Sequence, residues 1–172
     1  AAQAGQANAI FELGLMYYTG DLVKTNHQRA LSYFLRCADS GNASAMYNVA
    51  RIYHSTQDPK AVKWYEMAAQ DGLPQAMNQL AQMYCTGDLV EKDLKKGAHY
   101  YQLAVDTGSL SAMYNLAVLY KSGFGVEKDL QKAFDLFTLA AQKGEPDAMF
   151  HCVRLYENGN GTEPSRDNAV NW

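Results

Sequence analysis

The stretch SAMYNLAVLYKSGFGVEKDLQKAFDLFTLAAQKG, residues 111–144, decides the fold. Its first ten residues nearly repeat SAMYNVARIY, which stands at residues 44–53. Apolar residues follow the three-and-four spacing of an amphipathic helix, at Ala112, Met113, Leu116, Leu119 and Tyr120. After a glycine-containing turn the same spacing returns, at Ala133, Leu136, Phe137, Ala140 and Ala141. The stretch therefore predicts a hairpin of two helices, helix A and helix B.

The same hairpin recurs along the whole chain. A glycine marks each copy, with spacings of 36, 31, 36 and 36 residues between Gly5, Gly41, Gly72, Gly108 and Gly144. We number each repeat from this glycine as position 0. Position 4 is always alanine, and position 12 is always tyrosine, at Tyr17, Tyr53, Tyr84, Tyr120 and Tyr156. Five copies in one register predict a solenoid, in which stacked hairpins share a continuous core.

The predicted fold class is all-α, a right-handed α-α superhelix (solenoid) of helical hairpins. The array occupies residues 1–172 as one domain. Residues 1–4 end a preceding repeat, and the repeats are 5–40, 41–71, 72–107, 108–143 and a truncated 144–172. Because both ends fall inside a hairpin, we expect an excised segment of a longer array, without polar caps.

Turn residues support this register. Glycines at position 15 suit a left-handed helix end, at Gly20, Gly87, Gly123 and Gly159. Side chains that can cap helix B follow at position 21, at Asn26, Asp93, Asp129 and Ser165. The second repeat lacks five residues, all in its A-to-B turn. There Asp58 is the expected cap, and Pro59 the expected first helical residue.

Composition excludes several classes of partner. The chain carries 15 basic and 18 acidic residues, a formal net charge of -3, and so offers no basic field to nucleic acid. No stretch approaches the roughly 20 apolar residues of a membrane span, and the segment shows no targeting signal. We therefore expect a protein or peptide partner. The sequence indicates neither an oligomeric state nor a compartment.

Residues that carry chemistry are few. Cys37, Cys85 and Cys152 stand far apart and form no disulfide framework. Glycosylation sequons at Asn42 and Asn160 are weak evidence for a secretory compartment. The sequence contains no recognisable nucleophile motif, phosphate loop or metal-ligand spacing. We therefore expect no catalytic residue, metal site or cofactor, and no enzyme.

The succession MY, G-x-G-V, D, KA, an aromatic pair, AA and G resembles the Sel1-like repeat, a relative of the tetratricopeptide repeat (TPR). The resemblance covers essentially the whole chain and implies a Sel1-like/TPR-like solenoid. It also implies an adaptor that assembles other proteins, as in endoplasmic-reticulum quality control, chitin-synthase regulation and bacterial secreted factors. The cysteines depart from the family's cysteine-rich branch. The family's glycine at position 9 is kept at Gly14 and replaced at Ala50, Ala81, Ala117 and Val153.

A helical wheel places positions 3, 6, 7, 10 and 13 of helix A opposite its core stripe of positions 1, 4, 5, 8, 11 and 12. Helix A normally lines the concave side of such a superhelix, so these positions should face a groove. Position 6 carries Phe11, Tyr47, Asn78, Tyr114 and Phe150. Two interpretations stay open: the rings pack against the neighbouring helix A, or they anchor a partner segment.

Positions 7 and 10 add polar side chains. Position 7 carries Glu12, Asn48, Gln79, Asn115 and His151, and position 10 carries Leu15, Arg51, Gln82, Val118 and Arg154. An amide offers a donor and an acceptor to an extended peptide backbone, and related TPR modules use an asparagine at position 7 in that way. The alternative is a solvated face without a partner. The candidate groove residues are Phe11, Tyr47, Asn48, Arg51, Asn78, Gln79, Gln82, Tyr114, Asn115, Phe150, His151 and Arg154.

The sequence thus predicts a protein–protein interaction scaffold that binds a partner protein or peptide in the concave groove lined by helix A. The alternative is a structural or regulatory arm of a larger multidomain protein, which packs in cis on a domain outside this segment.

Overall fold

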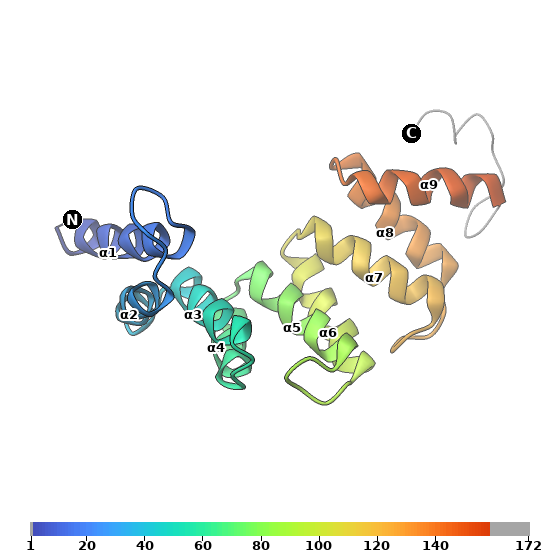
Figure 1. Ribbon diagram of the computed structural model, residues 1–172. Coiled ribbons are helices and arrows are strands. Elements are labelled where there is room, and N and C mark those ends of the chain that lie inside the picture. The colour runs from blue at the N-terminus through green and yellow to red at the C-terminus, as the bar shows by residue number, and fades with distance from the viewer. Residues whose placement is uncertain (1, 159–172) are drawn as a thin grey trace. The chain divides into compact units, whose positions relative to one another are not determined.

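A computed structural model describes residues 2–158 of the chain. These residues form nine α-helices (Figure 1): α1 (Ala2–Thr19), α2 (His27–Ala38), α3 (Ala43–Ser55), α4 (Lys60–Gln70), α5 (Pro74–Thr86), α6 (Leu94–Asp106), α7 (Leu110–Ser122), α8 (Leu130–Gln142) and α9 (Pro146–Asn158). No strand lies between residues 2 and 158, and the all-α prediction is confirmed. The odd-numbered helices are helix A of each repeat, and α2, α4, α6 and α8 are helix B.

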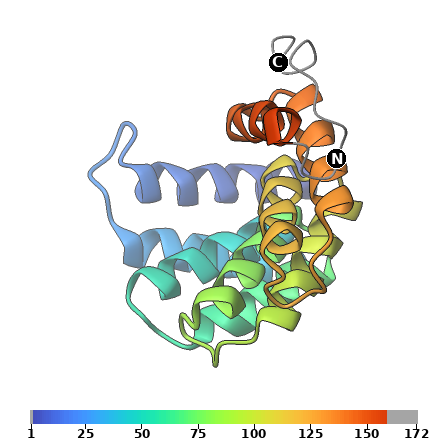
Figure 2. The ribbon, with the colours of Figure 1, turned by 90° about the vertical axis from the view of Figure 1, so that its right-hand side faces the viewer.

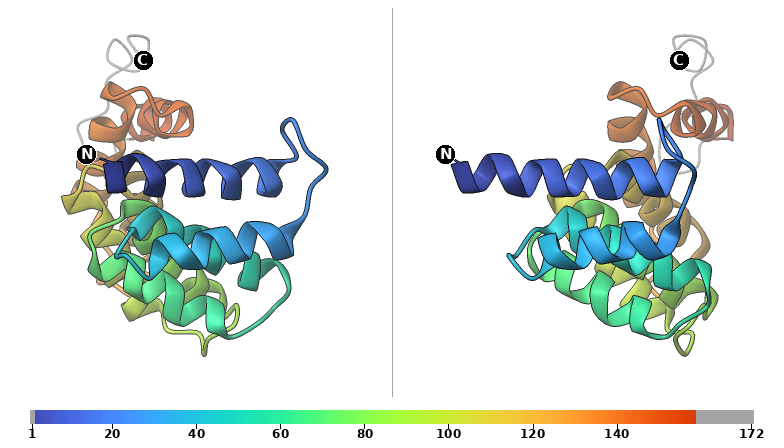
Figure 3. Two further views of the ribbon diagram at one scale, coloured as in Figure 1. Left: turned by 90° about the vertical axis from the view of Figure 1, so that its left-hand side faces the viewer. Right: turned by 60° about the vertical axis from the view of Figure 1, so that its left-hand side comes forward.

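The chain forms two compact units, residues 1–76 and 77–172. In the first unit α1 packs on α2, α2 on α3, and α3 on α4. In the second unit α6 packs on α7, α7 on α8, and α8 on α9. Figures 2 and 3 show α1 and α2 side by side, joined by the loop of residues 20–26. Packing between consecutive helices is the arrangement expected of stacked hairpins.

The first helix is longer than the repeat pattern predicts. It runs from Ala2 to Thr19 without a break at Gly5. Residues 2–4 therefore continue helix A of the first repeat, whereas the sequence pattern assigns them to the end of a preceding helix B. Alanine is the strongest helix former, and one glycine costs only about 1 kcal/mol in a helix, so an uninterrupted helix is reasonable here.

One buried aromatic ring stands in each described helix B. With the five-residue deletion counted as a gap, it lies at position 29, and its exposure is between 0 and 5% at Phe34, Tyr65, Tyr101 and Phe137. Helix A presents a small buried residue at position 9, at Gly14, Ala50, Ala81 and Ala117. A Cβ atom on Gly14 would lie 2.7 Å from the Phe34 ring. Position 9 therefore belongs to the close-packed core, although the predicted stripe omits it.

The repeated tyrosine at position 12 holds the loop between helix A and helix B. Its carbonyl oxygen accepts a backbone N–H over 2.8–3.0 Å, from position 21 at Asn26, Asp93 and Asp129, and from Asp58, at position 22, in the short repeat. A cation at position 24 lies 5.2–5.4 Å from the centre of the tyrosine ring, from Arg29, Lys60, Lys96 and Lys132. Both contacts survive the deletion in the second repeat. The carbonyl contact is open to any residue, whereas the cation–π contact needs an aromatic ring and so favours the recurring tyrosine.

The predicted caps of helix B are confirmed at Asn26, Asp93 and Asp129, whose side chains accept N–H groups of the first helical turn. In the short repeat, Asp58 accepts the N–H of Lys60 over 2.9 Å. Helix α4 begins at Lys60, one residue after the predicted start at Pro59. Ser165 and Gly159, which the pattern assigns to the last repeat, lie outside the described residues.

The sequon asparagine Asn42 has a structural role. Its side-chain oxygen accepts the N–H of Ala45 over 2.8 Å and so caps α3. The other sequon, at Asn160, lies outside the described residues.

Candidate partner-binding surface

We use the name helix A face for positions 3, 6, 7, 10 and 13 of the odd-numbered helices. The rings at position 6 of this face contact the buried ring of their own hairpin. The centroid separations are 5.6 Å for Phe11 and Phe34, 5.6 Å for Tyr47 and Tyr65, and 5.7 Å for Tyr114 and Phe137. Each of the three outer rings is half-buried. All three support the core through helix B, and Tyr114 also contacts His151 of the neighbouring helix A, with ring centroids 5.6 Å apart.

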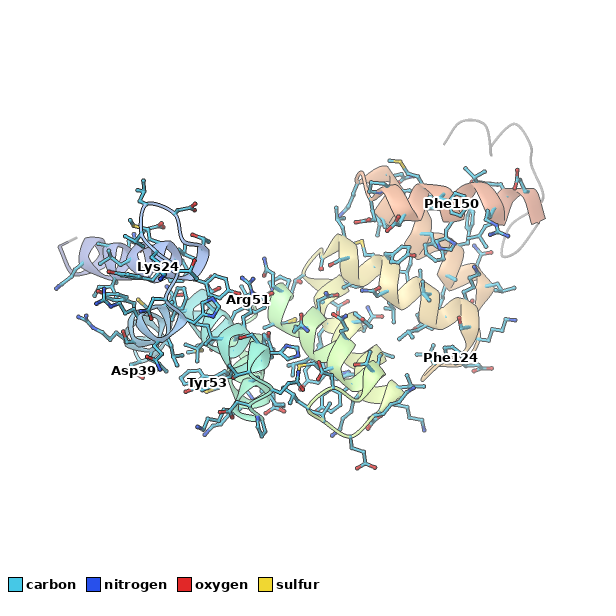
Figure 4. The ribbon with its side chains drawn as sticks, in the orientation of Figure 1. Lys24, Asp39, Arg51, Tyr53, Phe124 and Phe150 are labelled. Atoms are coloured by element: carbon cyan, nitrogen blue, oxygen red, sulfur yellow. The ribbon has the colours of Figure 1, made fainter. Side chains whose placement is uncertain are left out.

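Position 6 departs from this pattern in two repeats. In α5 the ring is replaced by Asn78, whose side-chain oxygen is buried without a hydrogen-bond donor among the described residues. In α9 the ring of Phe150 is 60% exposed, far more than the other rings at this position. Figure 4 shows Phe150 on α9. This face is therefore polar in the third repeat and openly aromatic in the fifth.

Asn48 is not free to hold a partner's backbone. The residue is 6% exposed, and its Nδ2 donates to the carbonyl of Ser44 over 2.9 Å. Its Oδ1 accepts Nη1 of Arg51 over 3.5 Å. Both ends of the amide are thus used inside α3, in contrast to the peptide-holding role predicted for it. Of the other position 7 residues, Gln79, Asn115 and His151 are half-buried, and Glu12 is exposed.

Position 10 carries the exposed cations of the helix A face. The Arg51 guanidinium lies 4.8 Å from the ring centre of Tyr18 and 5.9 Å from that of Tyr47. Arg154 lies 5.9 Å from the ring centre of Phe150. Gln82 at the same position of α5 is exposed, whereas Leu15 and Val118 are half-buried. Two repeats therefore present an exposed arginine against an aromatic ring.

His151 joins the rings of the fourth and fifth repeats. It stacks on Phe137 with centroids 4.7 Å apart, and its Nε2 lies 3.3 Å from the hydroxyl of Tyr114. Burial is the main cause that lowers the pKa of His151, and the positive charges of Lys121 and Arg154 lower it further. Burial likewise raises the pKa of the Tyr114 hydroxyl. At neutral pH a neutral imidazole fits this site best.

The predicted groove residues do not include every residue of this surface. Tyr18, at position 13 of α1, covers Arg51 of the next repeat, and it is absent from the predicted groove residues. The repeat register could have identified Tyr18, because position 13 lies on the face that the helical wheel predicted. The wheel also did not show that the position 29 rings of helix B contact the position 6 rings of helix A, because it represents one helix at a time.

These side chains can stack, donate hydrogen bonds and pair with charge. Within residues 2–158, no cluster of three histidine, cysteine or acidic side chains has the geometry to hold a metal ion. Cys37, Cys85 and Cys152 are free thiols. Among the described helices, none combines the length and the apolar content needed to span a membrane.

Helical hairpins in one register, with a small-residue core and a mixed aromatic and polar face, define an α-solenoid. The chain matches the Sel1 repeat over residues 7–42, 43–73, 74–109, 110–145 and 146–172, and it belongs to the Sel1 repeat family. Proteins of this family are generally protein–protein interaction scaffolds and generally non-catalytic. Their partners are typically proteins.

Solved structures show the same fold. A Sel1 repeat protein from Oxalobacter formigenes matches 96% of this chain and 70% of its own, with a TM-score of 0.87 and 28% identity. The c5321 antigen of uropathogenic Escherichia coli, described as displaying an SLR fold, matches 98% of this chain with a TM-score of 0.90 and 24% identity. The solenoid fold class is thereby confirmed.

A curated relative is much longer than this chain. It is the ERAD-associated E3 ubiquitin-protein ligase component HRD3A of Arabidopsis thaliana, 40% identical over 53 residues. The match covers 30% of this chain and 8% of HRD3A, and this chain covers 37% of the c5321 structure.

Proposed function

We propose that this chain is an interaction scaffold that holds an extended segment of a partner protein against its helix A face. The observation that carries the proposal is a recurring pair on that face. A ring at position 6 and an arginine at position 10 stand 5.9 Å apart both for Tyr47 with Arg51 and for Phe150 with Arg154. The pair recurs in both compact units.

Ring and arginine pairs are suited to binding. Tyrosine and arginine are enriched among the residues that dominate interface energies, because they combine apolar area with directed hydrogen bonds. Here the aromatic ring of Tyr47 is already packed on Tyr65, and that of Phe150 lies against His151. A partner would therefore meet a Tyr47 ring that has already lost conformational freedom by packing in its hairpin, which lowers the entropic cost of association.

Family membership supports the same role. Sel1 repeat proteins are generally scaffolds, and the name of the Arabidopsis relative describes a component of a ligase assembly. The alternative, an arm that packs in cis on a domain of the same protein, would use the same surface against an internal partner.

The test is affinity capture with a matched pair of variants. One variant carries Arg51→Ala, Phe150→Ala and Arg154→Ala, three exposed residues of the helix A face. The control carries Arg36→Ala, Gln70→Ala and Gln142→Ala, three exposed residues of helix B. Proteins captured from a lysate of the source cells are measured by quantitative mass spectrometry. The proposal predicts that the first variant loses partners that wild type and control retain.

Equal capture by both folded variants would overturn the proposal, and loss by the helix B variant alone would move the binding surface to the other helices. The cis-arm alternative predicts that a longer natural chain captures nothing at this face, whereas the isolated 172-residue segment binds the rest of that chain.

A further inference from the structure

Arg51 is held in one orientation by three contacts from two helices. The guanidinium lies 4.8 Å from the ring centre of Tyr18 in α1 and 5.9 Å from that of Tyr47 in α3. Its Nη1 donates to Oδ1 of Asn48 over 3.5 Å. Figure 4 shows Arg51 on α3 within the first unit. An arginine held in this way loses less side-chain freedom on binding than a solvated one.

Asn48 sets the orientation of this contact. The residue is 6% exposed, and its Nδ2 is engaged by the carbonyl of Ser44. With the amide nitrogen committed to its own helix, the oxygen points to Arg51. Asn48 is therefore a positioning residue: it acts through the guanidinium and is itself shielded from a partner.

No carboxylate of the described residues pairs with Arg51. Two exposed lysines in the first turn of helix B differ, because Nζ of Lys60 lies 3.6 Å from Oδ2 of Asp58 and Nζ of Lys132 lies 3.3 Å from Oδ2 of Asp129. Arg51 itself is exposed. A guanidinium has five N–H donors, and one long hydrogen bond to Asn48 leaves most of them for a ligand.

The chemistry that fits this group is a carboxylate. The planar fork of arginine matches a carboxylate with two parallel hydrogen bonds, and the flanking rings accept the methylene groups of an acidic side chain. A phosphorylated residue carries nearly two negative charges and is usually met by a cluster of arginines, which α1 and α3 do not supply around Arg51. The whole chain is acidic, with a net charge of -3. The attraction for a carboxylate therefore comes from Arg51 itself and not from the overall charge of the chain.

We infer that Arg51 is the receptor for a carboxylate of the partner segment, oriented by Tyr18, Tyr47 and Asn48. This inference rests on the proposed function, since it names the chemistry that the helix A face selects. We assign this carboxylate to an acidic side chain, because the Tyr18 and Tyr47 rings beside Arg51 can pack on its methylene groups. A carboxylate from the end of a chain is the alternative outcome of the test below.

The test starts from random 12-residue peptides displayed in two formats, one with a free C-terminus and one with the C-terminus fused to a carrier. Peptides selected on the wild-type chain are synthesised, and their affinities are measured by calorimetry. The inference predicts an acidic residue in peptides from the fused format. If a selected peptide binds through its free C-terminus and needs no acidic residue, the carboxylate is that of a chain end.

A double-mutant cycle then separates recognition from structure. Arg51→Gln should weaken the acidic peptide about 10- to 100-fold, the range for a hydrogen-bonded charge pair. Changing the peptide's Glu to Gln should weaken its binding to the wild-type chain by a similar factor. The same change should hardly alter its affinity for the Arg51→Gln variant. Arg51→Lys keeps the charge, and its affinity for the acidic peptide should lie between those of the wild-type chain and the Arg51→Gln variant. The control Arg36→Gln, an equal charge change on the exposed surface of α2, should stay within about twofold.

The outcomes distinguish the two proposals. If selected peptides lose binding with Phe150→Ala and Arg154→Ala, and show neither an acidic preference nor any effect of Arg51→Gln, the carboxylate inference is wrong and the helix A face stands. If binding is indifferent to Arg51, Phe150 and Arg154 alike, both proposals fail.

Discussion

The two nearly identical decapeptides, residues 44–53 and 111–120, adopt the same helix A but present different surfaces. Ala45 and Ala112 are both fully buried at position 4. At position 10 one repeat has the exposed Arg51 and the other the half-buried Val118. The same core residues therefore form the same hairpin in both repeats, whereas the residue at position 10 determines what the surface of that hairpin can bind.

The asparagine shared by the two copies, at position 7, also differs in its burial and contacts. In α3 Asn48 is buried and bonded to Arg51. In α7 Asn115 is half-buried, and the neighbouring Tyr114 lies 3.3 Å from His151 instead. Tyr47 and Asn48 thus contact an arginine in α3, whereas in α7 the matching tyrosine, Tyr114, contacts a histidine.

The largest expected effect separates core rings from face rings. Phe137→Ala removes a fully buried ring and should lower the free energy of unfolding by about 3–5 kcal/mol. Phe150→Ala removes a ring that is 60% exposed and should change it by less than about 1 kcal/mol. Urea unfolding followed by circular dichroism measures both. Similar losses would contradict the assignment of Phe137 to the core and of Phe150 to the surface.

The A-to-B loops provide the next comparison, at position 17. Leu22, Leu89 and Gly125 all have positive φ there, at 65°, 58° and 74°. A Cβ on Gly125 would collide with the backbone of Leu94, so Gly125→Ala should cost about 2–4 kcal/mol, from the left-handed backbone and from the clash.

Gly41→Ala is the matched control, because Gly41 has a φ of 84° with open space around its missing Cβ. It should cost only about 1 kcal/mol. Thermal unfolding compares the two, and equal costs would show that the loop does not pack against α6 as described.

Exchanging position 10 between the two decapeptides tests how recognition arises. Arg51→Val should weaken an acidic peptide ligand at least about tenfold, as expected for the loss of a charged hydrogen-bond partner. Adding Val118→Arg should not restore binding, because position 13 of the preceding repeat is Cys85 where Arg51 has Tyr18. Calorimetry with the same peptide measures both. Full restoration would mean that a charge anywhere on helix A suffices.

The smallest expected effect concerns the cap of α8. The backbone hydrogen bond from Lys132 is the main cause that holds the pKa of Asp129 below its usual value. A carboxyl with a depressed pKa in the folded state stabilises above its unfolded pKa of about 3.9, and the contribution is lost as pH falls through the folded value.

Asp129→Asn keeps the capping oxygen, as Asn26 does in the first repeat, and should reduce the loss of thermal stability between about pH 5 and pH 2. Melting curves across this range measure the difference. An unchanged pH profile would show that the Asp129 charge contributes nothing to the cap.

Much of this architecture could be predicted from the sequence, because it depends on local rules repeated five times. The stripes, the caps at Asn26, Asp93 and Asp129 and the preserved hairpin of the short repeat follow from spacing and turn chemistry. Contacts between helices could not be derived from a wheel. The burial of Asn48 depends on hydrogen bonds to Ser44 and Arg51, and the role of Tyr18 depends on the next repeat.

The most direct test of the account is an NMR titration of the isotope-labelled chain with its best acidic peptide. The account predicts that the Nε–H resonance of Arg51 and the amides of α1 and α3 shift, while those of α2 and α4 move little. Shifts confined to α2 and α4, with the Arg51 resonance unmoved, would contradict binding at the helix A face.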